Sequence, residues 1–157
     1  MQLQYDPEAP HRILVMMMAG DLDERTRSTL TARCGGDAEV RGVAPVPAGR
    51  AARITGDDHH ERPIAKQRLD ALRSALERRG IPMEGAIGDS DPTLAAEDEI
   101  AQFRPDELIV VLHAIGEEEP TERHLTARLR ERFLMPMTFI RTHPNGAARP
   151  TAQIVAD

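Results

Sequence analysis

Histidine and carboxylate side chains stand close together at two places where they could carry chemistry, and the first is a loop. Asp57, Asp58, His59 and His60 offer the oxygen and nitrogen atoms that metal ions bind. Neighbours along a chain rarely converge on one ion, because tetrahedral or octahedral geometry needs ligands that approach from different sides. We therefore interpret this group as part of a polar loop and predict no metal site there.

The second place surrounds His113, which directly follows the apolar run 108–112. A histidine at the carboxyl end of a buried strand can face a ligand cleft and can titrate near neutral pH. The alternative is a structural histidine held by hydrogen bonds. His124, in the helix-forming segment that follows, is a weaker candidate. Glu117, Glu118 and Glu119 lie between the two histidines, where negative charge suits the N-terminus of a helix and would repel a phosphate.

A glycine-containing turn, residues 88–92, leads into another element that could border a site. Gly88 ends a β-prone segment, Asp91 can accept hydrogen bonds from the first free amides of a helix, and Pro92 suits the first helical position. The helix-like stretch 93–103 and the apolar run 108–112 follow. This order predicts a β-α-β unit, whose loop lies at the carboxyl edge of a parallel sheet, where open α/β folds bind ligands.

The composition limits which functions are open to the chain. It has 157 residues and a formal net charge of −6, with 3% aromatic residues and one cysteine. Spread basic residues and scarce aromatics give no platform for nucleic acid, so we predict no nucleic-acid partner. No apolar stretch approaches ~20 residues, so we predict no membrane span. Cys34 excludes an intramolecular disulfide and is expected half-buried at a helix end. We see no signal peptide and expect a cytoplasmic protein.

Strand-like and helix-like segments alternate along the chain. We expect a lead-in over residues 1–10, one α/β domain over 11–143 and a tail over 144–157. The tail is mostly polar, but Ile154 and Val155 form a β-prone pair that could cap a sheet edge. The expected strands are 13–18, 39–44, 83–87, 108–112 and 137–142, and the expected helices are 22–34, 63–79, 93–103 and 120–133. This alternation predicts a parallel sheet with helices on both faces and right-handed crossovers. The irregular segment 45–63 is expected to be a functional or mobile loop.

Common catalytic and phosphate-binding motifs are absent from the sequence. There is no Gly-x-Gly-x-x-Gly, Walker-type loop, Gly-x-Ser-x-Gly or His-Glu-x-x-His. A phospho-acceptor receiver domain would need a lysine after the last strand, where the sequence has Arg141 and Thr142. We reject that interpretation.

The order of these elements resembles the universal stress protein family. The resemblance covers roughly residues 11–143. It depends on the opening strand at 12–15, the amphipathic helix 63–79, the loop and helix 88–96, and the segment 103–110, which matches the family's Asp-x-Ile-Val strand. It implies a three-layer doubly wound α/β sandwich, with a five-stranded parallel sheet of order 3-2-1-4-5. It also implies a homodimer, often formed through the last strand.

The sequence departs from the members of the family that bind ATP. Those members carry an aspartate where this chain has Met18, and a glycine-rich loop after the fourth strand. Here that loop reads His113, Ala114, Ile115, Gly116 and then three glutamates. Carboxylates block close approach and repel phosphate, since two like charges ~4 Å apart cost about 1 kcal/mol even in water. We predict no firm cofactor, with ATP or AMP disfavoured.

Our leading hypothesis is a non-catalytic, stress-related regulatory or accessory domain that binds a small molecule or nucleotide weakly, if at all. The ligand site would be the crevice between the first and fourth strands. Its candidate residues are Met18, Ala19, Gly20, Val43, Gly88, Asp89, His113, Ala114 and Gly116. One alternative is a nucleotide-binding or nucleotide-hydrolysing enzyme of the wider α/β class. Another is a protein-interaction module that uses the 45–63 loop or the tail.

Overall fold

The computed structural model describes residues 10–47 and 61–143, together with the backbone of 154–156. The acidic and histidine group at 57–60 and most of the 45–63 loop lie outside these residues. Among the described helices, none is long and apolar enough to cross a membrane.

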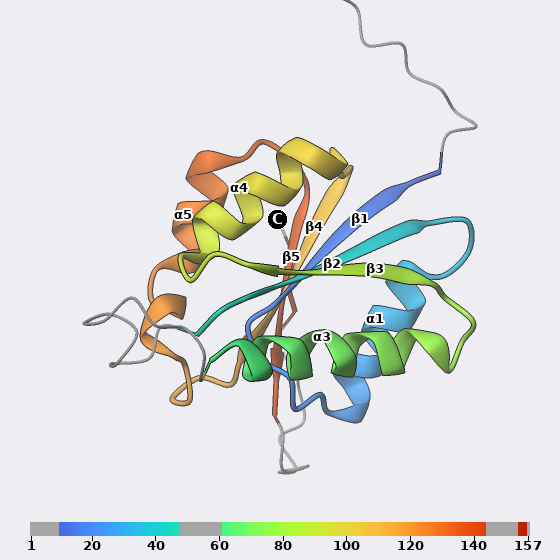
Figure 1. Cartoon of the computed structure of the whole chain (residues 1–157), viewed down its shortest axis with the longest axis horizontal. Coiled ribbons are helices and arrows are strands. Elements are labelled where there is room, and N and C mark those ends of the chain that lie inside the picture. Colours follow the sequence, from blue (N-terminus) through green and yellow to red (C-terminus); the bar gives the residue numbers. More distant parts are fainter. Residues whose placement is uncertain (1–9, 48–60, 144–153, 157) are drawn as a thin grey trace, which may run out of the picture.

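A single sheet forms the centre of the molecule, with strand order β3-β2-β1-β4-β5-β6 (Figure 1). The first five strands are all parallel, which confirms the predicted order 3-2-1-4-5. A sixth strand, antiparallel to β5, extends the five-stranded sheet that we expected. The strands are β1 (Arg12–Met17), β2 (Glu39–Pro45), β3 (Met83–Gly88), β4 (Glu107–His113), β5 (Met137–Thr142) and β6 (Ile154–Ala156).

Helices cover both faces of the sheet, as the β-α alternation predicts. The α-helices are α1 (Glu24–Cys34), α3 (Arg62–Glu77), α4 (Pro92–Phe103) and α5 (Leu125–Arg132), and η1 (Pro120–Glu122) is a short 3-10 helix. Helices α1 and α3 lie on one face, and α4 and α5 lie on the other (Figure 1). At the start of α4, Asp91 accepts a hydrogen bond from the backbone N–H of Thr93 at 2.9 Å, and Pro92 takes the first helical position.

The last predicted helix, 120–133, is in fact two separate elements. His124 has a left-handed backbone with φ of 59°, which interrupts the helical path between η1 and α5. Its expected place on a helix is therefore wrong, because it lies in the turn before α5. The break leaves η1 free to lie against the end of β4.

Two aliphatic cores lie on opposite faces of the sheet, and β1 contributes to both. Ile13, Val15 and Met17 point to the α1 and α3 side, whereas Leu14 and Met16 point to the α4 and α5 side. Alternation of this kind follows from the two-residue period of a strand. Cys34, at the end of α1, is fully buried and not half-buried as expected, because it packs into the first core. Burial raises the pKa of its thiol to about 12.

Strand β6 covers part of the outer edge of β5. Ile154 lies opposite Ile140, Val155 opposite Phe139, and Ala156 opposite Thr138. Because an open strand edge carries unpaired N–H and C=O groups, it can pair with another chain. In this structure the chain's own C-terminal strand takes that position along half of β5.

Candidate functional site

A small cavity lies at the carboxyl edge of the sheet, beside the end of β1. Its volume is about 150 Å³. It is bordered by the β1–α1 loop, the first turns of α3, and the last residues of β4 and β5. The lining residues are Ala19, Gly20, Asp21, Ile64, Gln67, Arg68, His113 and Thr142. Polar groups from four separate elements therefore converge where an open α/β sheet places its ligands.

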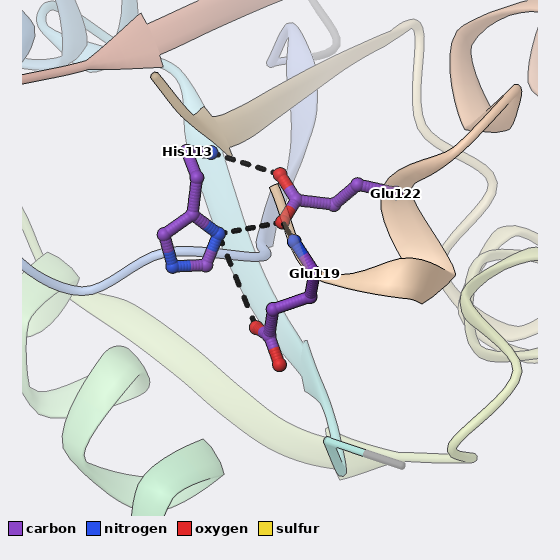
Figure 2. Close-up of side chains that lie close together, drawn as sticks. All are labelled: His113, Glu119 and Glu122. Atoms are coloured by element: carbon purple, nitrogen blue, oxygen red, sulfur yellow. Dashed lines mark hydrogen bonds and ion pairs between the residues drawn. The ribbon is translucent and has the colours of Figure 1, made fainter. Parts of the chain in front are cut away.

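A network of hydrogen bonds around His113 forms one wall of the site (Figure 2). Glu122 accepts hydrogen bonds from the Nδ1 of His113 at 2.6 Å and from its backbone N–H at 2.9 Å. The same carboxylate accepts the backbone N–H of Glu119 at 2.7 Å. Because an ionised carboxylate only accepts hydrogen bonds, Nδ1 must carry the proton. The other ring nitrogen, Nε2, lies on the side of the ring turned away from Glu122 (Figure 2).

The surroundings of His113 favour its protonated form. The hydrogen bond to Glu122 raises the pKa of the imidazole above its ordinary value, and the negative charges of Glu122 and Glu119 act in the same direction. Burial and the positive charge of Arg68 oppose this shift without cancelling it. Protonation gives the ring a second N–H donor at Nε2.

An ion pair between Arg68 and Glu119 joins α3 to the loop after β4. The guanidinium Nη2 donates to Oε1 of Glu119 at 2.5 Å. Only 10% of the Arg68 side chain is exposed, against 27% for Glu119. Gly20 packs against the same arginine: a Cβ at Gly20 would come within 3.0 Å of its Cγ. A side chain there would force Arg68 to shift.

The remaining carboxylates of the acidic loop also bind groups of the chain itself. Glu118 accepts the backbone N–H of Gly116 at 2.9 Å and lies 3.6 Å from Nη1 of Arg141. Hydrogen bonds from the backbone N–H groups of Glu118 and Gly116 lower the pKa of this carboxylate. Arg141 also donates to the carbonyl oxygen of His113 at 3.0 Å. These glutamates therefore accept hydrogen bonds from an amide and a guanidinium that could otherwise donate to a phosphate oxygen.

Three of the nine residues that we predicted for the crevice line the cavity, namely Ala19, Gly20 and His113. Met18 is 2% exposed and Val43 is fully buried, so both belong mainly to the core. Their role as ligand contacts stays a prediction.

The other predicted residues form the surrounding turns. At Gly88, a Cβ would lie 2.7 Å from that of Ala95, so this glycine allows β3 and α4 to pack closely. Asp89 accepts the backbone N–H of Asp91 at 2.9 Å and shapes the turn before α4. Ala114 is buried, and Gly116 has φ of 94°, which favours glycine.

Sequence reasoning missed Arg68, Glu122 and Thr142. Arg68 lies three residues after Ala65 and four before Leu72, so the helical period places it on the buried face of α3. This position in the helical period could have predicted that the arginine is buried. The Thr142 hydroxyl donates to the carbonyl oxygen of Asp21 at 2.8 Å, a contact between distant segments that local sequence patterns do not reveal.

Nitrogen and oxygen atoms of His113, Glu119 and Glu122 lie within 4.8 Å of one another, a spacing that could hold a metal ion. However, Glu122 already accepts three hydrogen bonds, and Glu119 is paired with Arg68. A metal would have to displace the proton on Nδ1 and break that ion pair. We therefore interpret the cluster as a hydrogen-bonded network.

A second hollow, of about 470 Å³, lies at the opposite edge of the sheet. The ends of α1 and α3 and the following turns border it. Its walls are largely small residues around Gly35, Gly36 and Gly80, with Arg79 as the single charged side chain among them. The smaller cavity beside His113, where charged groups converge, is the better candidate for a functional site.

Comparison with solved structures supports a universal-stress-protein-like fold. A universal stress protein from Archaeoglobus fulgidus is similar to this chain with a TM-score of 0.56 and 15% identity, over 82% of this chain and 92% of the other. A universal stress protein family protein from Arabidopsis thaliana with AMP bound has a TM-score of 0.54 and 15% identity, over 92% and 100% respectively. No protein-family model and no curated protein sequence matches the chain. The resemblance inferred from sequence is thus supported at the level of the fold.

Proposed function

We propose that this chain is a non-catalytic, stress-related regulatory or accessory domain with a small-molecule site in the crevice between β1 and β4. We further propose that the crevice binds nucleotides at most weakly. The fold supports the general assignment, since two solved structures of similar architecture are universal stress proteins. One of them has AMP bound, which makes a nucleotide the first ligand to consider.

The observation that carries the proposal is the pairing of the acidic loop with the chain's own donors. Glu118 holds the amide of Gly116, and Glu119 holds Arg68. A nucleotide phosphate would need these donors and would also approach the two carboxylates. The cavity of about 150 Å³ is smaller than the roughly 300 Å³ at which ordinary ligand pockets begin. Space and charge therefore both oppose the binding of a whole nucleotide.

Calorimetric titration tests this proposal most simply. ATP, ADP and AMP would be added to the protein with and without magnesium, and we expect no submillimolar binding. Submillimolar ATP binding by the wild-type chain that is lost in the Gly116→Glu variant would refute it, because the glycine loop would then be a working nucleotide site.

A second candidate, a hydrolytic enzyme, is favoured by the pair formed by His113 and Glu122. A buried carboxylate that fixes Nδ1–H and leaves Nε2 directed elsewhere is the arrangement of a general base. Thr142 is the one hydroxyl side chain among the described residues that line the cavity, and it already donates to Asp21. A water molecule would therefore have to be the nucleophile. Nucleotide turnover that is abolished in His113→Ala would favour this candidate over the first.

A further inference from the structure

Arg68 is a buried cation that faces a polar cavity, which is an uncommon position for arginine. The residue is only 8% exposed, yet it lines the cavity together with Gln67 and His113. Burying a guanidinium costs free energy unless an anion accompanies it. Glu119 supplies that anion in this structure.

Glu119 is more exposed than Arg68. Its side chain is 27% exposed, so it can return to water when it leaves the guanidinium. It lies on the loop before η1, whereas Arg68 is fixed on α3 between Ala65 and Leu72. An anion that replaces Glu119 would exchange one negative charge for another at Arg68 and would leave the buried cation paired.

His113 offers a second donor on the same cavity. Glu122 holds Nδ1, so the protonated ring presents Nε2–H on the side turned away from Glu122 (Figure 2). Two cationic donors from different elements suit a ligand with two or more oxygens that share a negative charge. A cavity of about 150 Å³ has room for such a group and corresponds to roughly five water molecules at ~30 Å³ each.

We propose that this cavity binds a small oxyanion between Arg68 and His113, and that Glu119 is the internal competitor that the oxyanion displaces. The inference rests on the proposed function, because it names the class of ligand for the same crevice. Inorganic phosphate and short carboxylates share the required chemistry. Neither needs the space that a nucleotide needs.

The charges around His113 determine how binding depends on pH. Glu119 and Glu122 favour the imidazolium, Arg68 opposes it, Arg141 donates to the His113 carbonyl, and Asp21 lies across the cavity. Oxyanion affinity should therefore be highest where His113 is protonated. For acetate, whose charge is constant in this range, the affinity should fall as the pH rises through the raised pKa of this histidine.

NMR titration of the His113 imidazole with inorganic phosphate, and separately with acetate, tests the proposal. Sodium chloride at equal ionic strength is the reference. We expect a saturable shift for the wild-type chain, and an affinity about tenfold higher in Glu119→Gln, where the competing charge is gone. Glu117→Gln is the matched control, because it removes a charge from the same acidic run at an exposed position. It should leave the affinity within about twofold of the wild type.

Variants of α3 provide the complementary test. Arg68→Gln should weaken phosphate binding at least tenfold, whereas Lys66→Gln, at an exposed position of the same helix, should not. Arg68→Lys serves as a second variant if the glutamine variant does not fold.

Equal phosphate affinity in all folded variants would overturn the proposal, and so would the absence of a saturable shift in both the wild type and Glu119→Gln. Acetate binding without phosphate binding would identify the ligand as a carboxylate. All of these outcomes concern phosphate or acetate. They are therefore distinct from submillimolar nucleotide binding, which would refute the proposed function itself.

Discussion

Replacing Glu122 by glutamine should both destabilise the protein and lower the pKa of His113. The Glu122 side chain is 1% exposed and accepts three hydrogen bonds, two from His113 and one from the amide of Glu119. Glutamine keeps the shape but has only one acceptor oxygen. Whichever way the amide turns, its NH₂ group faces at least one buried donor, at a cost of about 1–3 kcal/mol. Loss of the charge on the remaining bonds adds about 1 kcal/mol. We expect a total loss of about 3 kcal/mol.

The sign of the pH dependence follows from the raised pKa of His113. A histidine whose folded-state pKa lies above its unfolded value stabilises the fold fully below the unfolded pKa. This contribution is lost as the pH rises through the folded pKa. The difference in unfolding free energy between wild type and Glu122→Gln should therefore be larger at about pH 6 than at about pH 9.

Urea denaturation at the two pH values measures the stability, and NMR titration of the imidazole measures the pKa. Glu131→Gln is the control, because Glu131 is an exposed residue of α5. An unchanged His113 pKa in Glu122→Gln would show that Glu122 does not raise it. A stability loss that is the same at both pH values would also contradict it.

Three further predictions concern packing, the thiol and the sheet edge. Gly88→Ala should lower the unfolding free energy by about 1–3 kcal/mol in urea denaturation, because the added Cβ would meet Ala95 at 2.7 Å. A change below about 0.5 kcal/mol would contradict this close packing. The thiol of Cys34 should resist a thiol-specific reagent at mildly alkaline pH until the protein unfolds, and rapid labelling of the native protein would contradict its burial. We also propose a homodimer formed through β5. Because β6 covers half of that edge, removing residues 154–157 should strengthen self-association in light scattering, and an unchanged or weaker association would argue against this edge as the interface.

Much of the fold could be predicted from the sequence because local signals agreed with one another. Three local signals each located an element to within a few residues. They are the apolar run of β4, the start of α4 at Asp91 and Pro92, and the apolar stripe on α3. Parallel pairing and strand order then followed from the alternation and from the family resemblance. The break at His124 was missed because a left-handed residue other than glycine leaves little trace in a sequence.

The candidate site was less predictable, since its contacts join segments far apart in the chain. His113 was identified from its place at the end of a strand, and the structure puts it on the cavity wall. Arg68 could not be assigned, because its ion pair with Glu119 spans 51 residues. Glu122 lies only nine residues after His113, but its place beside the end of β4 depends on the break at His124, which was not predicted. That the acidic loop is a poor place for a nucleotide phosphate stays a prediction. However, the sequence did not show that Glu118 and Glu119 bind donors of the chain itself.

A crystal structure of the protein grown with AMP would show whether the acidic loop keeps a nucleotide out of the crevice. We expect Glu119 to stay on Arg68, Glu118 to stay on the amide of Gly116, and no nucleotide density beside His113. AMP seated between Ala19 and His113, with both glutamates displaced from their donors, would contradict it.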